Sequence, residues 1–448
     1  MLVVATLVQG SSGFARAKRK VPTRGEATQP LRASDVTSES LASGLEVVHL
    51  AVPRSAVVGV ALVVRSGSAD EEPGARGTAR LVEHLMFAGS ARVPPGEHAR
   101  GIAQLGGTTG ATTSPDFTLF YDAVATQHLE HVLALEADRL GALLLRETAL
   151  DAAHGLVADE RALEERESPI LGAMEASRRL LFAGDPYAPS PAVLRRAADR
   201  VDLAAVRRFF ERHYRPDNVT VVVVGGLSAE DARAAVERHF GALPARASAP
   251  RQGTLIAEPA RGQHAEASAA VPGLLASWRI PASAEADMLA LAVAAAILSD
   301  GDDSRLSRRF AAGIPGHAGV DAASYARGSA LAIGAIVDDA ARLPDAERAL
   351  FEEVARLARE APSDEEVARA VARFTAILVP ELETVAGLAR ALGEARAVRG
   401  DPGRPLATLG RVAQVTPAEV QRVVRTHLAA EHAVVVTFGP PTTGGAPR

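Results

Sequence analysis

The chain repeats itself once, and this repeat limits the possible fold more than any other feature of the sequence. A helical pattern near Val201 leads through a turn at residues 215–218 into an apolar strand that ends at Gly225. A second helix–strand unit ends at Gly439, so the two units are separated by nearly half of the chain. The same interval relates three further pairs, namely Arg208 and Arg422, His213 and His427, and Gly59 and Gly273. Solenoid repeats are about 20 to 50 residues long, so one much longer period indicates a duplicated domain.

Within each half, apolar strands are followed by long amphipathic helices, of which residues 129–145 show the clearest helical stripe. This mixture predicts the α+β class, with two duplicated domains in which helices flank a largely antiparallel sheet. The predicted division is a signal peptide and disordered leader at 1–35, an N-terminal domain at 36–242, a linker at 243–259, a C-terminal domain at 260–439 and a disordered tail at 440–448.

The composition excludes several classes of protein. The chain has 49 basic and 54 acidic residues and few aromatic ones, so it is not expected to bind nucleic acid. It has no cysteine, which excludes disulfides and thiolate metal sites. The longest apolar run, residues 288–298, is too short to span a bilayer and predicts a buried helix, so no membrane span is expected.

The N-terminus leaves the cellular compartment open. Residues 2–8 form a short apolar stretch and residues 15–17 fit a small-x-small cleavage site, but the basic start of a signal peptide is missing. A cleaved signal peptide would make the protein periplasmic or secreted. A disordered tail or a misassigned start would leave it in the cytoplasm.

One helix carries residues that point to metal chemistry. Arg80 and His84 lie one turn apart on the same helix face, where two imidazoles could hold one Zn²⁺ and Glu83 could deprotonate its bound water. Glu160 follows as a downstream third ligand of an H-x-x-E-H pattern. Arginine has no lone pair to offer and stays protonated, so the pattern has lost its first ligand.

Neither the second half nor another histidine restores this site. The repeat offset places the apolar residues Ala294, Ile297 and Leu298 at the corresponding positions, so only the first half carries the chemistry. Four other histidines each favour a structural interpretation. They are His128 and His131 in a helical pattern, His154 on a different helix face from Glu160, and His98 in a loop-like stretch.

Further motifs accompany this helix and extend the pattern from about residue 43 to residue 439. They are residues 67–74, 85–90, 106–116, 185–187 and 214–218, with 304–306 in the second half. Together these residues resemble the insulinase/pitrilysin family of inverted zinc metallopeptidases, of the mitochondrial processing peptidase-like, bacterial two-domain type. The resemblance implies two α+β domains that face each other as a clamshell, usually doubled in a dimer.

The resemblance also implies a role for several residues. Position 80, His84 and Glu160 would be the metal ligands, with Glu83 as the general base. The substrate-binding positions would be Gly110, Ala111 and Thr113, on an edge strand that pairs with the peptide backbone.

Several departures from the family pattern lie along this catalytic path. Arg80 replaces the first ligand, Ala153 stands where a second glutamate often supports the metal shell, and Gly110 replaces an asparagine. Loss of such a supporting residue typically costs 10- to 100-fold in metal affinity or activity.

The second half departs as well. Ala311 and Ala318 stand where many members place a substrate-binding Arg and Tyr, unless a small gap brings Arg309 or Tyr325 into those roles.

Two interpretations of Arg80 remain. It could be an internal cation that replaces zinc and bonds to Glu83 or Glu160, or it could have arisen by neutral drift at an unused site. We favour the internal cation, because an unpaired buried carboxylate is costly and an Arg–carboxylate pair is a charge-assisted bond.

The sequence therefore predicts a degenerate, non-catalytic member of the family, acting as one subunit of a heterodimeric zinc peptidase that encloses and binds peptides or unfolded polypeptides. One alternative is a homodimeric pseudopeptidase that serves as a peptide-binding or assembly subunit. The other is a weakly active zinc metalloendopeptidase that holds its metal through His84, Glu160 and a replacement ligand. No cofactor is expected, and zinc is the metal if one binds.

Overall fold

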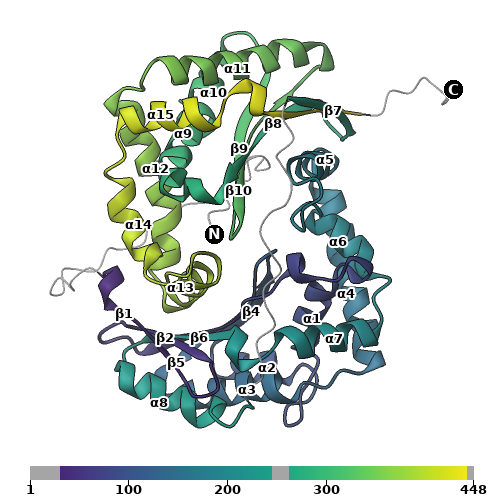
Figure 1. Cartoon of the computed structure of the whole chain (residues 1–448), viewed down its shortest axis with the longest axis vertical. Coiled ribbons are helices and arrows are strands. Elements are labelled where there is room, and N and C mark those ends of the chain that lie inside the picture. The colour runs from purple at the N-terminus through teal and green to yellow at the C-terminus, as the bar shows by residue number, and fades with distance from the viewer. Residues whose placement is uncertain (1–30, 245–261, 441–448) are drawn as a thin grey trace.

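The computed structural model describes residues 31–244 and 262–440, which form two sheets flanked by helices (Figure 1). The predicted tail from residue 441, most of the predicted linker and the predicted signal peptide lie outside the described residues. The two halves face each other, with the N-terminal half at the bottom of Figure 1 and the C-terminal half at the top.

The N-terminal half is built on a six-stranded sheet in the order β1-β2-β6-β3-β5-β4. Its strands are β1 (Val36–Ser40), β2 (Glu46–Ala51), β3 (Val57–Val64), β4 (Thr108–Thr113), β5 (Thr118–Ala125) and β6 (Val219–Gly225). Its helices are α1 (Thr78–Leu85), α2 (Glu97–Gln104), α3 (Leu129–Ala142), α4 (Glu147–Glu167), α5 (Leu171–Leu181), α6 (Pro191–Ala198), α7 (Leu203–His213) and α8 (Ala229–Phe240). The strands pair antiparallel except β2 with β6.

The C-terminal half has a five-stranded sheet in the order β7-β11-β8-β10-β9. Its strands are β7 (Gln263–Ser268), β8 (Gly273–Pro281), β9 (Gly316–Tyr325), β10 (Gly328–Val337) and β11 (Val434–Gly439). Its helices are α9 (Met288–Ser299), α10 (Arg305–Ala311), α11 (Leu343–Arg359), α12 (Asp364–Leu382), α13 (Val385–Arg399), α14 (Arg404–Val412) and α15 (Pro417–His427). Only the β7–β11 pair of this sheet is parallel.

The sheets show the duplication directly. With the extra strand β1 set aside, the order β2-β6-β3-β5-β4 corresponds strand by strand to β7-β11-β8-β10-β9. Helices α7 and α15 are separated, at both of their ends, by the same interval that separates Gly225 from Gly439. The predicted α+β class with largely antiparallel sheets is confirmed.

Strand β3 shows why these runs fold as buried strands. Successive side chains of a strand point to opposite faces. Val60 and Leu62 enter the core beneath the N-terminal helices, whereas Ala61 and Val63 pack on the other face with residues of α13. Because both faces are covered, the strand is apolar throughout instead of alternating with polar residues.

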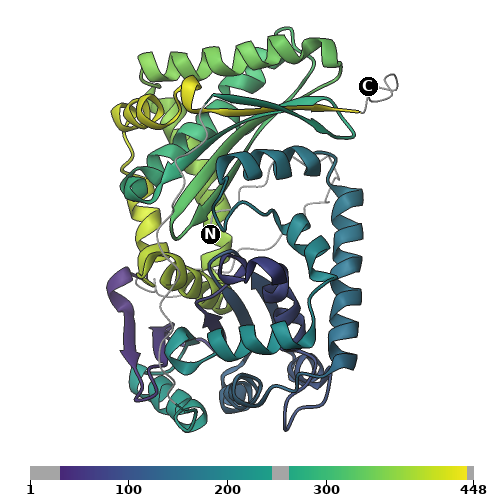
Figure 2. The same cartoon turned by 45° about the vertical axis from the view of Figure 1, so that its right-hand side comes forward.

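The two halves exchange one helix each. Helix α13 of the C-terminal half packs on the N-terminal sheet through Leu388 and Leu392, and α5 of the N-terminal half packs on the C-terminal sheet through Ala173 and Ala176. Figure 2 shows α5 beneath the upper sheet and the long helix α4, in blue, along one side. The starts of helices α5 and α13 are also separated by the repeat interval, so the exchange is symmetric.

Three local predictions can be compared with the structure. The apolar run 288–298 forms the buried helix α9, as predicted. Residues Ala282–Ser299 are long and apolar enough to cross a membrane, but half of this segment is buried in the protein and α9 lies in the C-terminal core. The predicted helix 129–145 ends earlier, at Ala142, because Leu143 turns to an extended conformation and bridges to Ser90.

Candidate active site

The helix that carries the metal-like motif starts at a glycine that no other residue could replace without strain. Gly77 has a φ of 95°, and a Cβ there would lie 2.5 Å from the carbonyl oxygen of Leu194. The buried carboxylate of Glu71 then caps α1, since it accepts hydrogen bonds from the backbone N–H groups of Gly77 and Ala79, both at 2.8 Å. Burial raises the pKa of Glu71 to about 7.

Arg80 bonds to both carboxylates of the motif. Its Nη1 donates to both oxygens of Glu83 at 2.6 Å, and its Nε donates to Glu160 Oε2 at 3.0 Å. Its Nη2 donates to the other oxygen of Glu160. The hypothesis of an internal cation bonded to Glu83 or Glu160 is therefore confirmed in its geometry, and Arg80 reaches both partners.

His84 and Glu160 complete the site. His84 Nε2 lies 3.3 Å from Glu160 Oε1, an ion pair when the imidazole is protonated. Arg195 on α6 adds a second cation, with its Nε 3.7 Å from Glu160 Oε2 and its Nη1 3.0 Å from Glu164. The structure thus brings Arg80, Glu83, His84 and Glu160 together from α1 and α4, two helices that lie far apart in the sequence.

The charges of the site are fixed by these contacts. Burial alone would raise the pKa of Glu160, but the His84 imidazole and the Arg80 guanidinium lower it to about 2. Burial acts to lower the pKa of Arg80, but Glu160 and Glu83 outweigh it, so that pKa rises. Arg80 and Arg195 therefore supply positive charge beside Glu83 and Glu160 without a metal.

These residues do not fit a catalytic zinc ion. Such an ion takes three protein ligands and a water molecule, but of the three ligand positions only His84 and Glu160 carry a lone pair. Both oxygens of Glu160 already accept hydrogen bonds from Arg80, whose positive charge repels a cation. No zinc-dependent step follows from this arrangement. The position that often holds a glutamate supporting the metal shell is changed as well, because Ala153 is an apolar residue of the buried core.

The predicted substrate strand is β4, the edge strand of the N-terminal sheet. Gly110 lies opposite Tyr121 in the register, and a Cβ at Gly110 would lie 2.6 Å from the Tyr121 hydroxyl. The aromatic ring therefore occupies the space that a side chain at position 110 would need. Ala111 packs toward the core, and the Thr113 hydroxyl donates to Glu83.

The positions of the C-terminal half that were expected to bind substrate do not bring an arginine to this site. Arg309 is an exposed residue of α10 whose Nη2 lies 3.0 Å from Glu352. Ala318 sits within β9, and Tyr325 ends that strand with its hydroxyl accepting from Arg178 of α5. Tyr325 therefore joins the two halves.

A polar contact between the halves was not anticipated from the sequence. Asp116 accepts a hydrogen bond from the Tyr187 hydroxyl and another, at 2.9 Å, from the backbone N–H of Ala326 in the β9–β10 turn. The Tyr187 and Tyr325 rings lie 4.8 Å apart. Asp116 and Tyr187 both stand in the motifs at 106–116 and 185–187, which was the available signal, but only the fold brings these motifs together.

A cavity of about 470 Å³ lies in the C-terminal half, on the side of α13 and β9–β10 that meets Tyr121 of β5. Its lining includes Arg390 and Glu394 on α13, with Ser324 and Phe374, and Tyr121 is the lining residue from the N-terminal half. Tyr121 lies opposite Gly110 in the sheet, but residues of β4 are not part of the lining. The volume of the cavity is in the range of ordinary ligand pockets. Arg80, Glu83, His84 and Glu160 lie outside its lining.

One of the four other histidines differs from its prediction. His98 is a buried residue of helix α2, not of a loop, because the segment after Gly96 folds into a full helix. It lies beside Asp122 and Glu136. His154 is on the continuous helix α4, as expected, six residues from Glu160 and on another face.

Comparison with known proteins gives two matching family models and several relatives. Residues 46–173 match the model described as "Insulinase (Peptidase family M16)", and residues 200–374 match "Peptidase M16 inactive domain". The zinc protease PqqE of Helicobacter pylori is 26% identical over 275 residues, which cover 60% of this chain and 62% of that protein.

Solved structures share the fold. A protease from Helicobacter pylori has a TM-score of 0.81 at 20% identity, covering 90% of this chain and 99% of that one. The periplasmic protease PqqL of Escherichia coli has a TM-score of 0.71 at 20% identity, and the match covers 91% of this chain and 48% of PqqL.

Proposed function

Because the chain belongs to the insulinase family, peptidase family M16, we propose that it is the non-catalytic subunit of a heterodimeric zinc peptidase. In this assembly the chain binds and encloses a peptide or unfolded polypeptide, and a homologous catalytic subunit hydrolyses it. The observation that carries the proposal is the Arg80 guanidinium, which bonds to both Glu83 and Glu160.

The bonding of Glu83 supports a vestigial role for this residue. A general base must offer a lone pair to the water that it deprotonates. Both oxygens of Glu83 accept from Arg80, and the Thr113 hydroxyl donates to one of them as well. Charge-assisted bonds of this kind are about twice as strong as neutral ones, so a water molecule competes poorly for the carboxylate.

The surroundings of the site support peptide binding. An extended peptide can pair with an exposed sheet edge through main-chain hydrogen bonds alone, without help from particular side chains. Strand β4 is such an edge, and its residues from Thr109 to Thr113 are partly exposed. Tyr121 lies beside Gly110 of this edge and also lines the cavity of the C-terminal half, which offers space for side chains of the bound peptide.

We place this assembly in the periplasm. The structural neighbour PqqL is described as a periplasmic protease. Fractionation of cells that express the tagged full chain tests this compartment, and recovery in the cytoplasm alone would contradict it.

The decisive experiment co-expresses the chain with a homologue that has an intact H-x-x-E-H motif. We expect a stable complex on size-exclusion chromatography and hydrolysis of an unfolded peptide by the complex only. A Glu→Gln change of the general base in the homologue should abolish hydrolysis, whereas Glu83→Gln in this chain should leave it unchanged. Glu352→Gln, an exposed glutamate of α11, is the matched surface control.

Other outcomes have separate meanings. Hydrolysis by the isolated chain, lost on addition of a chelator, would refute the proposal and favour the weakly active peptidase. A stable homodimer that binds peptide and ignores the homologue would refute the heterodimer and favour the homodimeric pseudopeptidase.

A further inference from the structure

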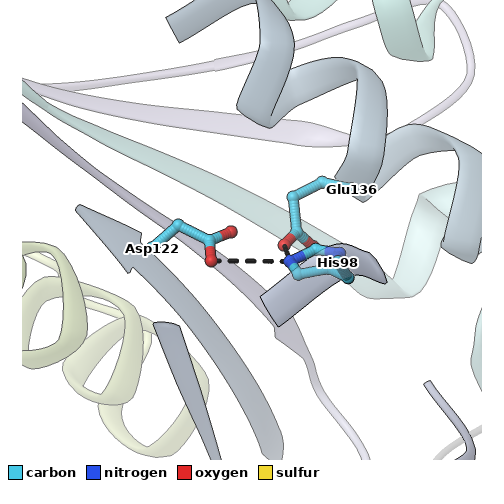
Figure 3. Close-up of side chains that lie close together, drawn as sticks. All are labelled: His98, Asp122 and Glu136. Carbon is cyan, nitrogen blue, oxygen red and sulfur yellow. Dashed lines mark ion pairs between the residues drawn. The ribbon is translucent and has the colours of Figure 1, made fainter. Parts of the chain in front are cut away.

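A second polar cluster lies inside the N-terminal half, on the helix-covered face of its sheet. It combines His98 from α2, Asp122 from β5 and Glu136 from α3 (Figure 3). Arg139, also on α3, pairs with Glu136. The exposed fractions of these four residues are 4%, 1%, 1% and 2%. Asp122 shares its face of β5 with the core residue Phe120, two positions away, so the cluster is separated by the sheet from α13 and the cavity.

The cluster leaves several polar atoms without partners. His98 Nε2 is 3.5 Å from Asp122 Oδ1 and 3.7 Å from Glu136 Oε1, both beyond a good hydrogen bond. Within the described part of the chain, Nε2 of His98 and both carboxylate oxygens of Asp122 are buried and make no hydrogen bond. Buried groups left in this state are costly, so the arrangement calls for an occupant.

The spacing of these atoms is that of ligands around one metal ion. Zinc lies about 2.0 to 2.2 Å from nitrogen and oxygen ligands, and a tetrahedral arrangement places such ligands about 3.3 to 3.6 Å apart. The two distances from His98 Nε2 are 3.5 and 3.7 Å, and the three donor atoms all lie within 4.8 Å of one another. The distances between these atoms are therefore too long for hydrogen bonds but close to the distances between ligands that share one cation.

We propose that His98, Asp122 and Glu136 form a structural binding site for one divalent transition-metal ion. One imidazole and two carboxylates, without any thiolate, suit zinc or manganese and disfavour Cu(I). No residue of this site belongs to the group around Arg80, so the proposal is independent of the function proposed above.

Arg139 acts on this site through Glu136. Its Nε donates to Glu136 Oε2 at 2.9 Å, and its Nη2 donates to Oε1. Its guanidinium carbon is 4.5 Å from the ring centre of Phe120 and 4.9 Å from that of Phe87. Both oxygens of Glu136 therefore accept from Arg139, as those of Glu160 accept from Arg80, but among the residues that the structure describes the oxygens of Asp122 and the Nε2 of His98 stay unbonded. The guanidinium balances one of the two carboxylates and fixes its orientation, as groups bonded to metal ligands commonly do. One negative charge remains for a cation or a proton.

The proton is the competing occupant. Burial raises the pKa of Glu136 well above its usual range. Burial opposes ionisation of Asp122, but His98, Glu136 and Arg139 lower its pKa to about 2. Burial and the charge of Arg139 lower the pKa of His98, and His131 acts in the same direction. The ligands of a metal must lose their protons, so a metal at this site competes with protons and its affinity rises with pH.

The burial of the site dictates how it is loaded. Because the ligands are almost fully enclosed, the ion is expected to enter during folding and leave on unfolding. The full chain is therefore unfolded with a chelator, refolded at pH 8 with excess Zn²⁺ or Co²⁺, desalted, and assayed for bound metal. We expect one ion per chain and visible absorption bands from Co²⁺. Asp122→Asn should lower the metal content at least tenfold.

Two control variants separate this site from other histidines. His128→Gln removes a histidine at the start of α3, outside the cluster, and should retain the metal. The double variant His84→Ala with Glu160→Gln should retain it as well. A folded wild-type chain without bound metal would overturn the proposal and leave a proton as the occupant. Metal that survives Asp122→Asn and is lost from the double variant would also overturn it.

If Asp122→Asn does not refold, X-ray absorption of the zinc-loaded wild type decides. One histidine nitrogen with carboxylate oxygens is the expected ligand set. Zinc without a histidine ligand would overturn the proposal.

Discussion

Two polar clusters in the N-terminal half contain the same kinds of group in different arrangements. Each has one histidine, two carboxylates and an arginine that pairs with a glutamate three residues away on the same helix, and the first also has Arg195 beside Glu160. Arg80 spans both carboxylates of its cluster, Glu83 and Glu160. Arg139 bonds to Glu136.

The difference shows that the reach of the arginine decides what a cluster can still bind. In the Arg80 cluster all carboxylate oxygens accept hydrogen bonds, and solvent reaches Glu160, whose side chain is 29% exposed. In the Arg139 cluster both oxygens of Asp122 and the Nε2 of His98 are buried and unbonded within the described residues. The first cluster thus has no unbonded carboxylate oxygen left for a cation, whereas the second, within the described part of the chain, has two.

The largest expected effect is on stability, and it tests this contrast directly. In metal-free protein, Arg139→Met should lower the free energy of unfolding by about 3 to 5 kcal/mol, because it leaves the buried carboxyl groups of Asp122 and Glu136 without their cation. Arg80→Met should cost about 1 to 3 kcal/mol, since solvent can hydrate part of the freed carboxylates. Urea unfolding of the two variants measures both values. Equal losses would contradict the contrast.

The second prediction converts the Arg80 cluster into a metal site. Arg80→His supplies the missing ligand beside His84 and Glu160, so zinc affinity at this site should rise at least 100-fold, or about 2.7 kcal/mol. Peptide hydrolysis should stay absent, because Ala153 and Gly110 are unchanged. Zinc titration and a fluorogenic peptide assay, both in the Asp122→Asn background, measure the two effects. Chelator-sensitive hydrolysis would show that Arg80 alone had silenced the site.

The sequence predicted the fold more completely than it predicted the contacts between distant segments. The repeat offset and the periodicity of the apolar residues anticipated the α+β class and the paired sheets, because both properties depend on local pattern. The helix motif anticipated that Arg80 would meet Glu83 or Glu160. The exchange of α5 and α13 between the halves and the contact of Asp116 with Tyr187 were missed, because they depend on how distant segments meet.

His98 illustrates the same limit in a single residue. Taken alone it stood in a loop-like stretch with no carboxylate at ligand spacing, since Asp122 and Glu136 lie far along the chain. Strand β5 and helix α3 bring both carboxylates to it. Spacing along the sequence marks candidate ligands most readily when they share one element, as position 80 and His84 do in α1.

The third prediction concerns pH, where the clusters should respond in opposite directions. The pKa of Glu160 falls from 4.5 to about 2 on folding, so its stabilisation is present above pH 4.5 and is lost as pH falls toward 2. The pKa of Glu136 is raised, so its contribution is fully present below pH 4.5 and declines as pH rises through its folded pKa.

Unfolding free energies of metal-free protein across pH 2 to 9 test these signs. The deficit of Glu160→Gln relative to wild type should shrink toward pH 2. For Glu136→Gln, the free energy of unfolding relative to that of wild type should instead rise as the pH rises. If the difference in unfolding free energy from wild type changes with pH in the same direction for both variants, the assigned pKa shifts are contradicted.

The smallest expected effect concerns Thr113, whose hydroxyl donates to Glu83 although its strand is predicted to bind substrate. Thr113→Val should lower the free energy of unfolding by about 0.5 to 1.5 kcal/mol, because Glu83 loses one donor while Arg80 keeps its charge balanced. Thr112→Val, the preceding residue of β4, is the matched control for a lost hydroxyl on this strand. If the two changes cost the same, Thr113 does not hold Glu83, and the carboxylate depends on Arg80 alone.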